Sequence, residues 1–330
     1  MIVVLDCHAR RIKEELTMAM VIVFGSLNID LVMKVKHQPA VGETISTKTY
    51  DWLPGGKGCN QAVACARSGV KTAMVGQIGD DGFGTRLFNT LKKNEVLASG
   101  VARHDSEPTG MAMITVDENG DNQIVVAGGA NRAMTSEQVP NEILHGDNVA
   151  LMQMEVNYSE NWDVVKRAKA SGAKTILNLA PAAAVPREVL DDLDYLIVNQ
   201  IEGRQMAEKM GLKIEDSAVA LASKLAKEAG LTCVMTLGPL GCIAIKPDGK
   251  GWKVDAYSIG DELVDTTGAG DTFCGVFAGC VFKKMSLQET LRHASVSGSL
   301  ACKGHGAQSS MPYESDIEEY LEQIPKAVAV

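Results

Sequence analysis

The sequence lacks the features of a membrane, secreted or nucleic-acid-binding protein. No apolar run approaches the roughly 18 residues of a transmembrane helix. At the N-terminus apolar residues precede Arg10 and Arg11, the reverse of a signal peptide, and residues 327–330 carry no peroxisomal signal. The net charge of -9 argues against binding to a phosphate backbone. We therefore expect a cytoplasmic protein with no membrane or nucleic-acid partner.

Paired cysteines are also missing. The 8 cysteines include no C-x-x-C pair, and most lie among apolar or small residues. This distribution is typical of reduced thiols and argues against a disulfide framework or a zinc site. With 45% hydrophobic residues over 330 positions, the chain can bury the core of one large α/β domain, with or without a small appendage.

Two common nucleotide-binding fingerprints are absent. The phosphate loop G-x-x-x-x-G-K-[ST] fails at Lys57, because Gly58 follows the lysine. No strand-like run leads into G-x-G-x-x-G, which argues against a dinucleotide-dependent dehydrogenase. The sequence also contains no internal repeat and no low-complexity linker. Any nucleotide site must therefore be built from other motifs.

Strand-length apolar runs alternate with helix-length amphipathic segments from residue 21 onward. Strands are expected at 21–25, 73–78, 149–154, 175–179, 195–198 and 233–236, and helices at 60–68, 162–170 and 217–229. The alternation predicts a Rossmann-like, mostly parallel sheet with helices on both faces, which binds ligands beyond the carboxyl ends of its strands. We expect one domain over residues 20–330, preceded by an N-terminal extension at 1–19.

Two regions, about 31–50 and 111–127, break this alternation. Apolar and polar residues alternate along 31–36, 44–50, 111–117 and 123–127, and Asn119-Gly120 is a strong hairpin turn. These segments predict a small antiparallel sheet that projects from the main domain. It could serve as a lid or a dimer surface, or it could be a simple edge extension.

The segment Asp265-Thr266-Thr267-Gly268-Ala269-Gly270-Asp271 leads into an apolar stretch, 273–282. We predict a helix N-terminus here, where the amides of Gly268, Ala269 and Gly270 would bind a phosphoryl oxygen. A carboxylate at Asp271 would repel that anion unless it acts on something else, such as the proton of an attacking hydroxyl. Taken alone, the pattern is also typical of a capping aspartate.

A second glycine turn, Gly55-Gly56-Lys57-Gly58-Cys59-Asn60-Gln61, also leads into a helix. Lys57 would supply a cation and Asn60 a donor and an acceptor. Asn28 and Asp30 follow the first strand and would share one face, where they could bind adjacent hydroxyls. Glu155 ends another strand and could also accept from a hydroxyl. A solvated lysine, an Asn/Asp turn and a structural glutamate are the alternatives.

Two further segments follow predicted strands. Asn199 and Glu202 could orient Mg²⁺ or phosphates through water, and Thr236, Gly238 and Gly241 could surround a nucleotide with backbone groups. Each signal is weak alone.

Together these residues resemble the ribokinase family of sugar kinases, from about residue 20 to about residue 315 and in the family's order. The resemblance implies a ribokinase-like fold and transfer of a phosphoryl group from Mg-ATP to O5 of D-ribose. Asp271 would be the base, and the amides of Gly268, Ala269 and Gly270 the anion hole. The implied sugar contacts are Asn28, Asp30, Gly56, Lys57, Asn60, Glu155 and Asp271. The implied nucleotide contacts are Asn199, Glu202, Thr236, Gly238, Gly241 and Gly270.

The resemblance also implies K⁺ as an activator and a homodimer formed through the lid. The matching K⁺ ligands are Asp265, Thr267, Ala301, Gly304, Gly306 and Ser310. One departure is Asn178-Leu179-Ala180-Pro181, where the family usually has proline in place of Leu179. Deoxyribose, another pentose or a nucleoside remain possible acceptors, although Lys57 disfavours nucleosides. A sugar-binding protein without catalysis is the alternative from another class.

Overall fold

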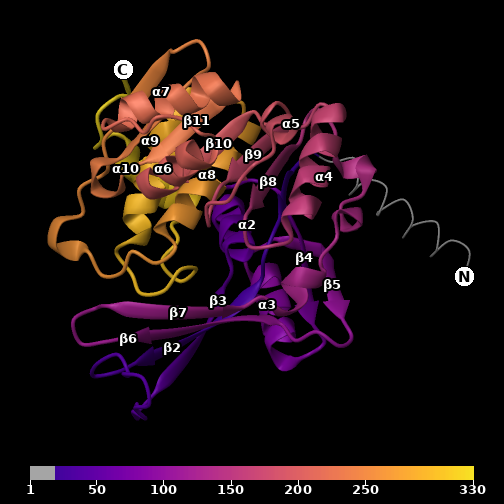
Figure 1. Ribbon diagram of the computed structural model, residues 1–330, viewed down its shortest axis with the longest axis vertical. Helices are drawn as coiled ribbons and strands as arrows, with labels where there is room; N and C mark the ends of the chain where they lie inside the picture. The colour runs from indigo at the N-terminus through magenta and orange to yellow at the C-terminus, as the bar shows by residue number, and fades with distance from the viewer. Residues whose placement is uncertain (1–18) are drawn as a thin grey trace, which may run out of the picture.

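The computed structural model describes residues 19–330, so the predicted extension lies outside the described residues except for its last one. Within this range ten strands form one sheet in the order β14-β13-β12-β11-β10-β9-β8-β1-β4-β5 (Figure 1). Their bounds are β1 Val21–Phe24, β4 Thr72–Gly79, β5 Leu97–His104, β8 Val149–Gln153, β9 Lys174–Asn178, β10 Tyr195–Asn199, β11 Thr232–Thr236, β12 Cys242–Ile245, β13 Gly251–Val254 and β14 Val328–Ala329. The pairings from β5 to β11 are parallel and those from β11 to β14 antiparallel. The predicted, mostly parallel sheet is confirmed.

Helices cover both faces of this sheet because its strands are apolar on both sides. Val21 and Val23 of β1 belong to one buried cluster, whereas Ile22 and Phe24 belong to the other. The first cluster packs under α2 (Lys57–Arg67), α3 (Gly82–Lys93), α8 (Ala269–Phe282), α9 (Leu287–Ala301) and α10 (Glu314–Leu321). The second packs under α4 (Tyr158–Ala170), α5 (Arg187–Leu190), α6 (Gln200–Lys209) and α7 (Ala218–Ala229).

A four-stranded sheet projects below this body in Figure 1, and we call it the lid. Its strands are β2 (Asn28–Lys34), β3 (Tyr50–Gly55), β6 (Gly110–Val116) and β7 (Asn122–Ala127), in the order β3-β2-β6-β7. The two hairpins β2/β3 and β6/β7 are antiparallel, as expected. They join through a parallel pair, β2/β6, because both strands leave the main sheet in the same direction, after β1 and β5.

One predicted lid strand is misplaced. The strand expected at 44–50 lies at Tyr50–Gly55, where Gly55 pairs with Asn28 and Leu53 with Asp30. Pro54 is tolerated because β3 is an edge strand, whose outer groups need no partner. The lid therefore runs directly into the glycine turn that starts α2.

No helix within residues 19–330 combines the length and apolarity needed to span a bilayer. Within the described residues the cysteines are all free and buried, namely Cys59, Cys65, Cys233, Cys242, Cys274, Cys280 and Cys302. Burial raises the pKa of several of these thiols, for example that of Cys233 to about 12. Cys7 lies outside the described residues.

Candidate active site

A cavity of about 170 Å³ opens at the carboxyl ends of the central strands. It is lined by Lys57, Asn178, Ala180, Ile197, Val198, Asn199, Glu202, Thr236, Gly268, Gly270, Asp271 and Cys274. Residues predicted for the sugar, the phosphates and the nucleotide therefore meet in one place, from four different segments of the chain. Five predicted sugar residues do not line this cavity, namely Asn28, Asp30, Gly56, Asn60 and Glu155.

Two helices begin at this cavity, and each has a glycine at its N-cap. Gly56 precedes α2 with φ 87° and Gly268 precedes α8 with φ 80°, conformations that residues with a side chain rarely adopt. A Cβ on Gly268 would lie 2.7 Å from Cβ of Ala307, so this turn is closely packed. At Gly270, by contrast, an added Cβ would meet nothing within 4 Å. The cavity side of the α8 turn is thus open to a ligand.

The start of α8 carries no side-chain cap. The amide of Ala269 donates to the carbonyl of Thr266 over 3.2 Å, so it is already used within the protein. Among the described residues, the amides of Gly268 and Gly270 have no such acceptor. Of the three amides predicted to form the anion hole, those of Gly268 and Gly270 are therefore free to bind a ligand. The amide of Ala269 stabilises the turn.

Asp271 lies in the first turn of α8 and is only 9% exposed. Its Oδ2 accepts from Asn60 Nδ2 over 2.9 Å, and its Oδ1 accepts from Gln61 Nε2 over 3.0 Å. The carboxylate is therefore not a helix cap; both of its oxygens are held by amides of α2.

Two of the predicted sugar residues, Asn28 and Asp30, belong to the lid strand β2 and lie outside the residues that line the cavity. Asn28 and Asp30 are two residues apart on β2 and so lie on one face of the strand. Burial, together with the charges of Glu155 and Asp271, raises the pKa of Asp30 to about 7. The Asp271 carboxylate raises the pKa of Lys57 against the opposing effect of burial. The charges of Asp30, Lys57, Glu155 and Asp271 are therefore close enough to interact electrostatically.

Glu155 makes hydrogen bonds within the protein and also interacts electrostatically with Asp30, one of the predicted sugar residues. Its Oε2 accepts from the Ser26 hydroxyl over 2.6 Å and from the backbone amide of Lys57 over 3.0 Å. It thereby ties the start of α2 to the segment between β1 and β2. Both the predicted hydroxyl contact and the structural alternative fit this position.

On the nucleotide side, Asn199 and Glu202 form a capping box at the start of α6. Asn199 Oδ1 accepts from the Glu202 amide and Glu202 Oε2 accepts from the Asn199 amide, each over 2.8 Å. Burial raises the pKa of Glu202. Thr236 lines the cavity, whereas Gly238 and Gly241 lie in the turn beyond β11, outside the lining. A Cβ on Gly241 would lie 2.0 Å from the Val254 carbonyl oxygen, so packing against β13 already requires this glycine.

The segment predicted to bind K⁺ is drawn together by hydrogen bonds. Asp265 accepts from the amide of Thr267 and from that of Gly306, each over 2.9 Å. The Ser310 hydroxyl donates to the Gly306 carbonyl over 2.6 Å. Partial burial raises the pKa of Asp265, but hydrogen bonds from Thr267 and Gly306 outweigh it, so the pKa is lowered overall. Ala301 ends α9 just before this loop, and Gly304 packs against Ser310.

Sequence reasoning assigned no site role to four buried amide residues, namely Gln61, Asn131, Asn178 and Gln308. Asn131 donates to Asn28 Oδ1 over 2.8 Å, and Gln308 donates to Asn60 Oδ1 over 2.9 Å. Gln61 stands beside Asn60 in the glycine motif, which was the one available signal. Asn178 stands in the segment 178–181 noted above, but without an assigned role. Asn131 and Gln308 contact site residues more than a hundred positions away, and no local pattern marks them.

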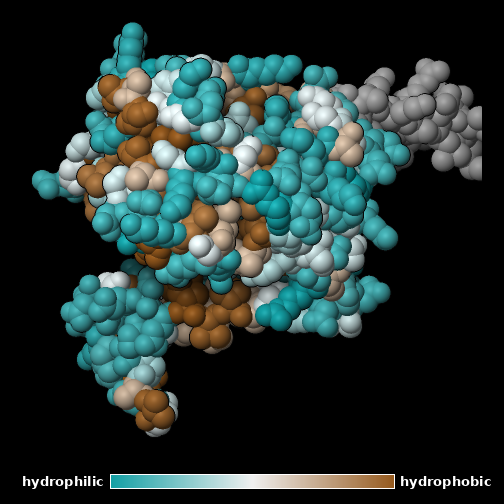
Figure 2. Space-filling model, turned by 45° about the horizontal axis from the view of Figure 1, so that its top comes forward, coloured by the Kyte–Doolittle hydropathy of each residue, from teal (hydrophilic) through white to brown (hydrophobic). Residues whose placement is uncertain are grey.

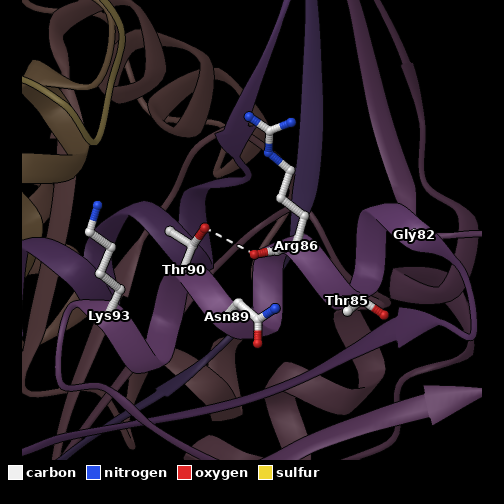
Figure 3. Close-up of a pocket in the computed structure, with 6 residues that line it drawn as sticks. All are labelled: Gly82, Thr85, Arg86, Asn89, Thr90 and Lys93. Atoms are coloured by element: carbon white, nitrogen blue, oxygen red, sulfur yellow. Dashed lines mark hydrogen bonds between the residues drawn. The ribbon is translucent and has the colours of Figure 1, made fainter.

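A second depression, about 380 Å³, lies along one helix, α3 (Figure 3). Its lining is Gly82, Thr85, Arg86, Asn89, Thr90 and Lys93, and the Thr90 hydroxyl donates to the Arg86 carbonyl over 3.0 Å. None of the predicted site residues lies here, and no carboxylate faces it. The first cavity, which holds predicted site residues, is therefore the candidate site.

Comparison with known proteins places the chain among sugar kinases. The model of the pfkB family of carbohydrate kinases matches residues 18–314, so the chain belongs to this family. Within the family, the ribokinase of Haemophilus influenzae is 34% identical over 305 residues, covering 91% of this chain and 97% of that protein. The ribokinase of Bacillus subtilis is 34% identical over 301 residues, covering 91% of this chain and 98% of its own length. The structure of Arabidopsis thaliana ribokinase complexed with ribose and ATP has a TM-score of 0.83 at 31% identity, over 92% of this chain and 99% of that one.

Proposed function

We propose that this chain transfers the γ-phosphoryl group of ATP to O5 of D-ribose, giving D-ribose 5-phosphate and ADP. The observation that carries the proposal is the single cavity that joins Asp271, the open amides of Gly268 and Gly270, and Lys57. Such a set suits a hydroxyl that must lose a proton while it attacks a phosphorus atom. The ribokinases reported above support ribose as the acceptor.

In the proposed reaction Asp271 is the general base. Its carboxylate accepts the proton of the O5 hydroxyl as that oxygen forms a bond to the γ-phosphorus, and the bond to the ADP oxygen breaks. The open amides at the start of α8, aided by the helix dipole, stabilise the negative charge on the transferred group. Ala269 belongs to this anion hole as its support, since its own amide is used by Thr266.

The sugar would be held by Asn28, Asp30, Gly56, Lys57, Asn60 and Glu155, in addition to the base. The nucleotide would be held by Asn199, Glu202, Thr236, Gly238 and Gly241, with Gly270 at the phosphates. Gly238 and Gly241 would contribute through the shape of the turn beyond β11 because they do not line the cavity. The open position at Gly270 supports close approach of a phosphate to the backbone.

Two cations belong to the proposal. Mg²⁺ would enter with ATP near Glu202 and Asn199, where oxygen ligands of the kind it prefers face the cavity. When bound, it would neutralise charge on the phosphates. K⁺ would be held by oxygens of Asp265, Thr267, Ala301, Gly304, Gly306 and Ser310. The hydrogen-bonded loop around Asp265 fits such an oxygen-only site, and a cation there would brace the turn at Gly268.

The lid would cover the sugar and exclude water, which limits wasteful ATP hydrolysis. We also propose that it pairs with a second lid in a homodimer. Ile124, Val125 and Val126 of the edge strand β7 are 54%, 68% and 54% exposed, and Met113 beside them is 47% exposed. Figure 2 shows a hydrophobic patch at the lower edge of the molecule, beside the projecting arm. Such exposed apolar area on an edge strand is typical of an interface.

The experiment that tests this function identifies the product. Purified protein with Mg-ATP and D-ribose should yield ribose 5-phosphate, recognised by its ³¹P resonance and its coupling to the C5 protons. Asp271→Ala should slow product formation by about 10²–10⁴-fold. It should still bind ribose, measured by calorimetry. Wild-type protein that forms no sugar phosphate, or an alanine variant with near-normal kcat, would reject the proposal.

A further inference from the structure

We infer that Gln61 is a positioning residue that holds the base Asp271 in its working orientation; this inference rests on the proposed function. The Gln61 side chain is fully buried and does not line the cavity, so it can act on the reaction only through its contacts. Its Nε2 donates to Oδ1 of Asp271 over 3.0 Å, opposite the bond from Asn60 to Oδ2.

The contact depends on close packing of α2 against α8. One turn after Asp271, Gly275 faces α2, and a Cβ there would lie 2.4 Å from the Gln61 carbonyl oxygen and 2.7 Å from Cβ of Ala64. The absence of a side chain at Gly275 lets the two helices approach. An amide side chain of glutamine length can then reach the carboxylate on the neighbouring helix.

The amide of Gln61 is held in one orientation. Nε2 also donates to Oδ1 of Asn178 over 3.0 Å, and Oε1 accepts from Nε2 of Gln153 over 2.8 Å. An ionised carboxylate only accepts hydrogen bonds, so the NH₂ end must face Asp271. Turning the amide over would break all three bonds. The hydrogen bond from Gln153 therefore helps to keep Nε2 of Gln61 directed at Asp271.

This arrangement holds both carboxylate oxygens of the base in place. A hydrogen bond to the charged form of a carboxylate stabilises that form, and a neutral donor does so without adding an ion pair. The titratable groups that interact with the Asp271 charge are Asp30, Lys57, Cys59, Glu202 and Cys274. Lys57 carries the opposite charge to the base, and Gln61 adds a neutral donor to Oδ1.

The test compares variants at Gln61 with a variant at Gln153, the residue that donates to the Gln61 side chain. Gln61→Met keeps the length of the side chain but removes its donor. We expect kcat to fall about 10- to 100-fold, as for a slightly misplaced catalytic group. The KM values for sugar and ATP should change by less than about twofold. The acid limb of the kcat–pH profile should move to higher pH. Gln61→Glu should be slower still, because it sets a second carboxylate against Asp271.

Gln153→Met is the matched comparison, since it makes the same chemical change one step further from the base and removes only the bond to Gln61 Oε1. It should lower kcat less than Gln61→Met does and leave the acid limb unchanged, because Gln61 still donates to Asp271 and Asn178. A folded Gln61→Met with wild-type kcat and acid limb would overturn the inference and leave Gln61 as a packing residue. If Gln61→Met does not fold, Gln61→Glu carries the same comparison, and wild-type kcat in it would be equally contrary. All variants are assayed on the acceptor that the wild-type protein phosphorylates, so failure of ribose would reject the substrate and not this inference.

Discussion

The Nδ2 atom of Asn131 lies 2.8 Å from the Oδ1 atom of Asn28, so one buried amide fixes the orientation of another. Asn131 also bonds both the amide and the carbonyl of Leu27, over 2.9 and 3.1 Å. Asn131 follows β7 in the chain and forms a hydrogen bond with Asn28, the first residue of β2. It therefore connects the two hairpins of the lid at their base. The contact fixes which end of the Asn28 amide is the oxygen, and its Nδ2 has no protein acceptor among the described residues.

Asn131→Ala should therefore weaken both the fold and sugar binding. Loss of partners for the buried groups of Leu27 should cost about 1–3 kcal/mol of unfolding free energy. The KM for the sugar should rise more than the KM for ATP, because Asn28 loses its fixed orientation. Urea unfolding and steady-state kinetics measure the two effects. Asn89→Ala, on the surface of α3, is the control, and a sugar KM equal in both variants would contradict the account.

Asp30 should make stability depend on pH. Its pKa rises from 3.8 to about 7 on folding, first through burial and then through Glu155 and Asp271. Between these values the folded protein holds a proton that the unfolded chain has lost, so stability falls as pH rises. From about pH 5 to about pH 8, wild type should lose about 2.7 kcal/mol relative to Asp30→Asn, because the difference in bound protons lasts until the folded pKa of about 7 is passed.

Urea unfolding of both proteins at the two pH values measures that difference. Asp51→Asn, an exposed aspartate on the neighbouring strand β3, serves as the control and should behave like wild type. Equal pH dependence in wild type and Asp30→Asn would show that Asp30 titrates normally.

Two glycines of α8 should respond in opposite ways to an added methyl group. At Gly270 a Cβ meets nothing within 4 Å, so Gly270→Ala should fold with unchanged thermal stability. The methyl should obstruct the phosphate, and kcat/KM for ATP should fall about tenfold or more. At Gly275 a Cβ meets backbone of α2, so Gly275→Ala should lose about 1–3 kcal/mol of stability. Thermal melts and kinetics of the pair check both statements; a destabilised Gly270→Ala with normal kinetics would reverse the assignment.

The proposed dimer should depend on β7. Val125→Glu places a charge on a side chain that is 68% exposed, so the monomer should remain folded. If the lid forms the interface, burying that charge is costly and sedimentation should show a shift from dimer to monomer. Ile201→Glu, on an equally exposed residue of α6, is the control and should remain dimeric. A wild-type monomer, or a dimer unaffected by Val125→Glu, would reject the lid interface.

The sequence predicted the main sheet because its strands are buried on both faces and stand out as short apolar runs. It also placed the residues around Lys57 and Asp271 at helix starts, since a glycine turn followed by an apolar stretch is a local signal. The strand at Tyr50–Gly55 was misplaced because its position is set by pairing with β2 and its own pattern is interrupted by Pro54.

What local patterns could not supply were contacts across the fold. Gln61 reaches Asp271 over a separation of 210 positions, and Asn131 reaches Asn28 over 103. The role of Gly241 was also hidden, because its need for glycine comes from the approach of β13. Such contacts follow from how helices and strands pack, which the pattern of neighbouring residues does not encode.

The most direct test of the central claim is ADP release from Mg-ATP, measured with D-ribose, 2-deoxyribose, fructose and adenosine, each in K⁺ and in Na⁺. We expect fast release that requires ribose and increases in K⁺. Equal release without any acceptor, or none with every acceptor in folded protein that still binds ribose, would contradict it.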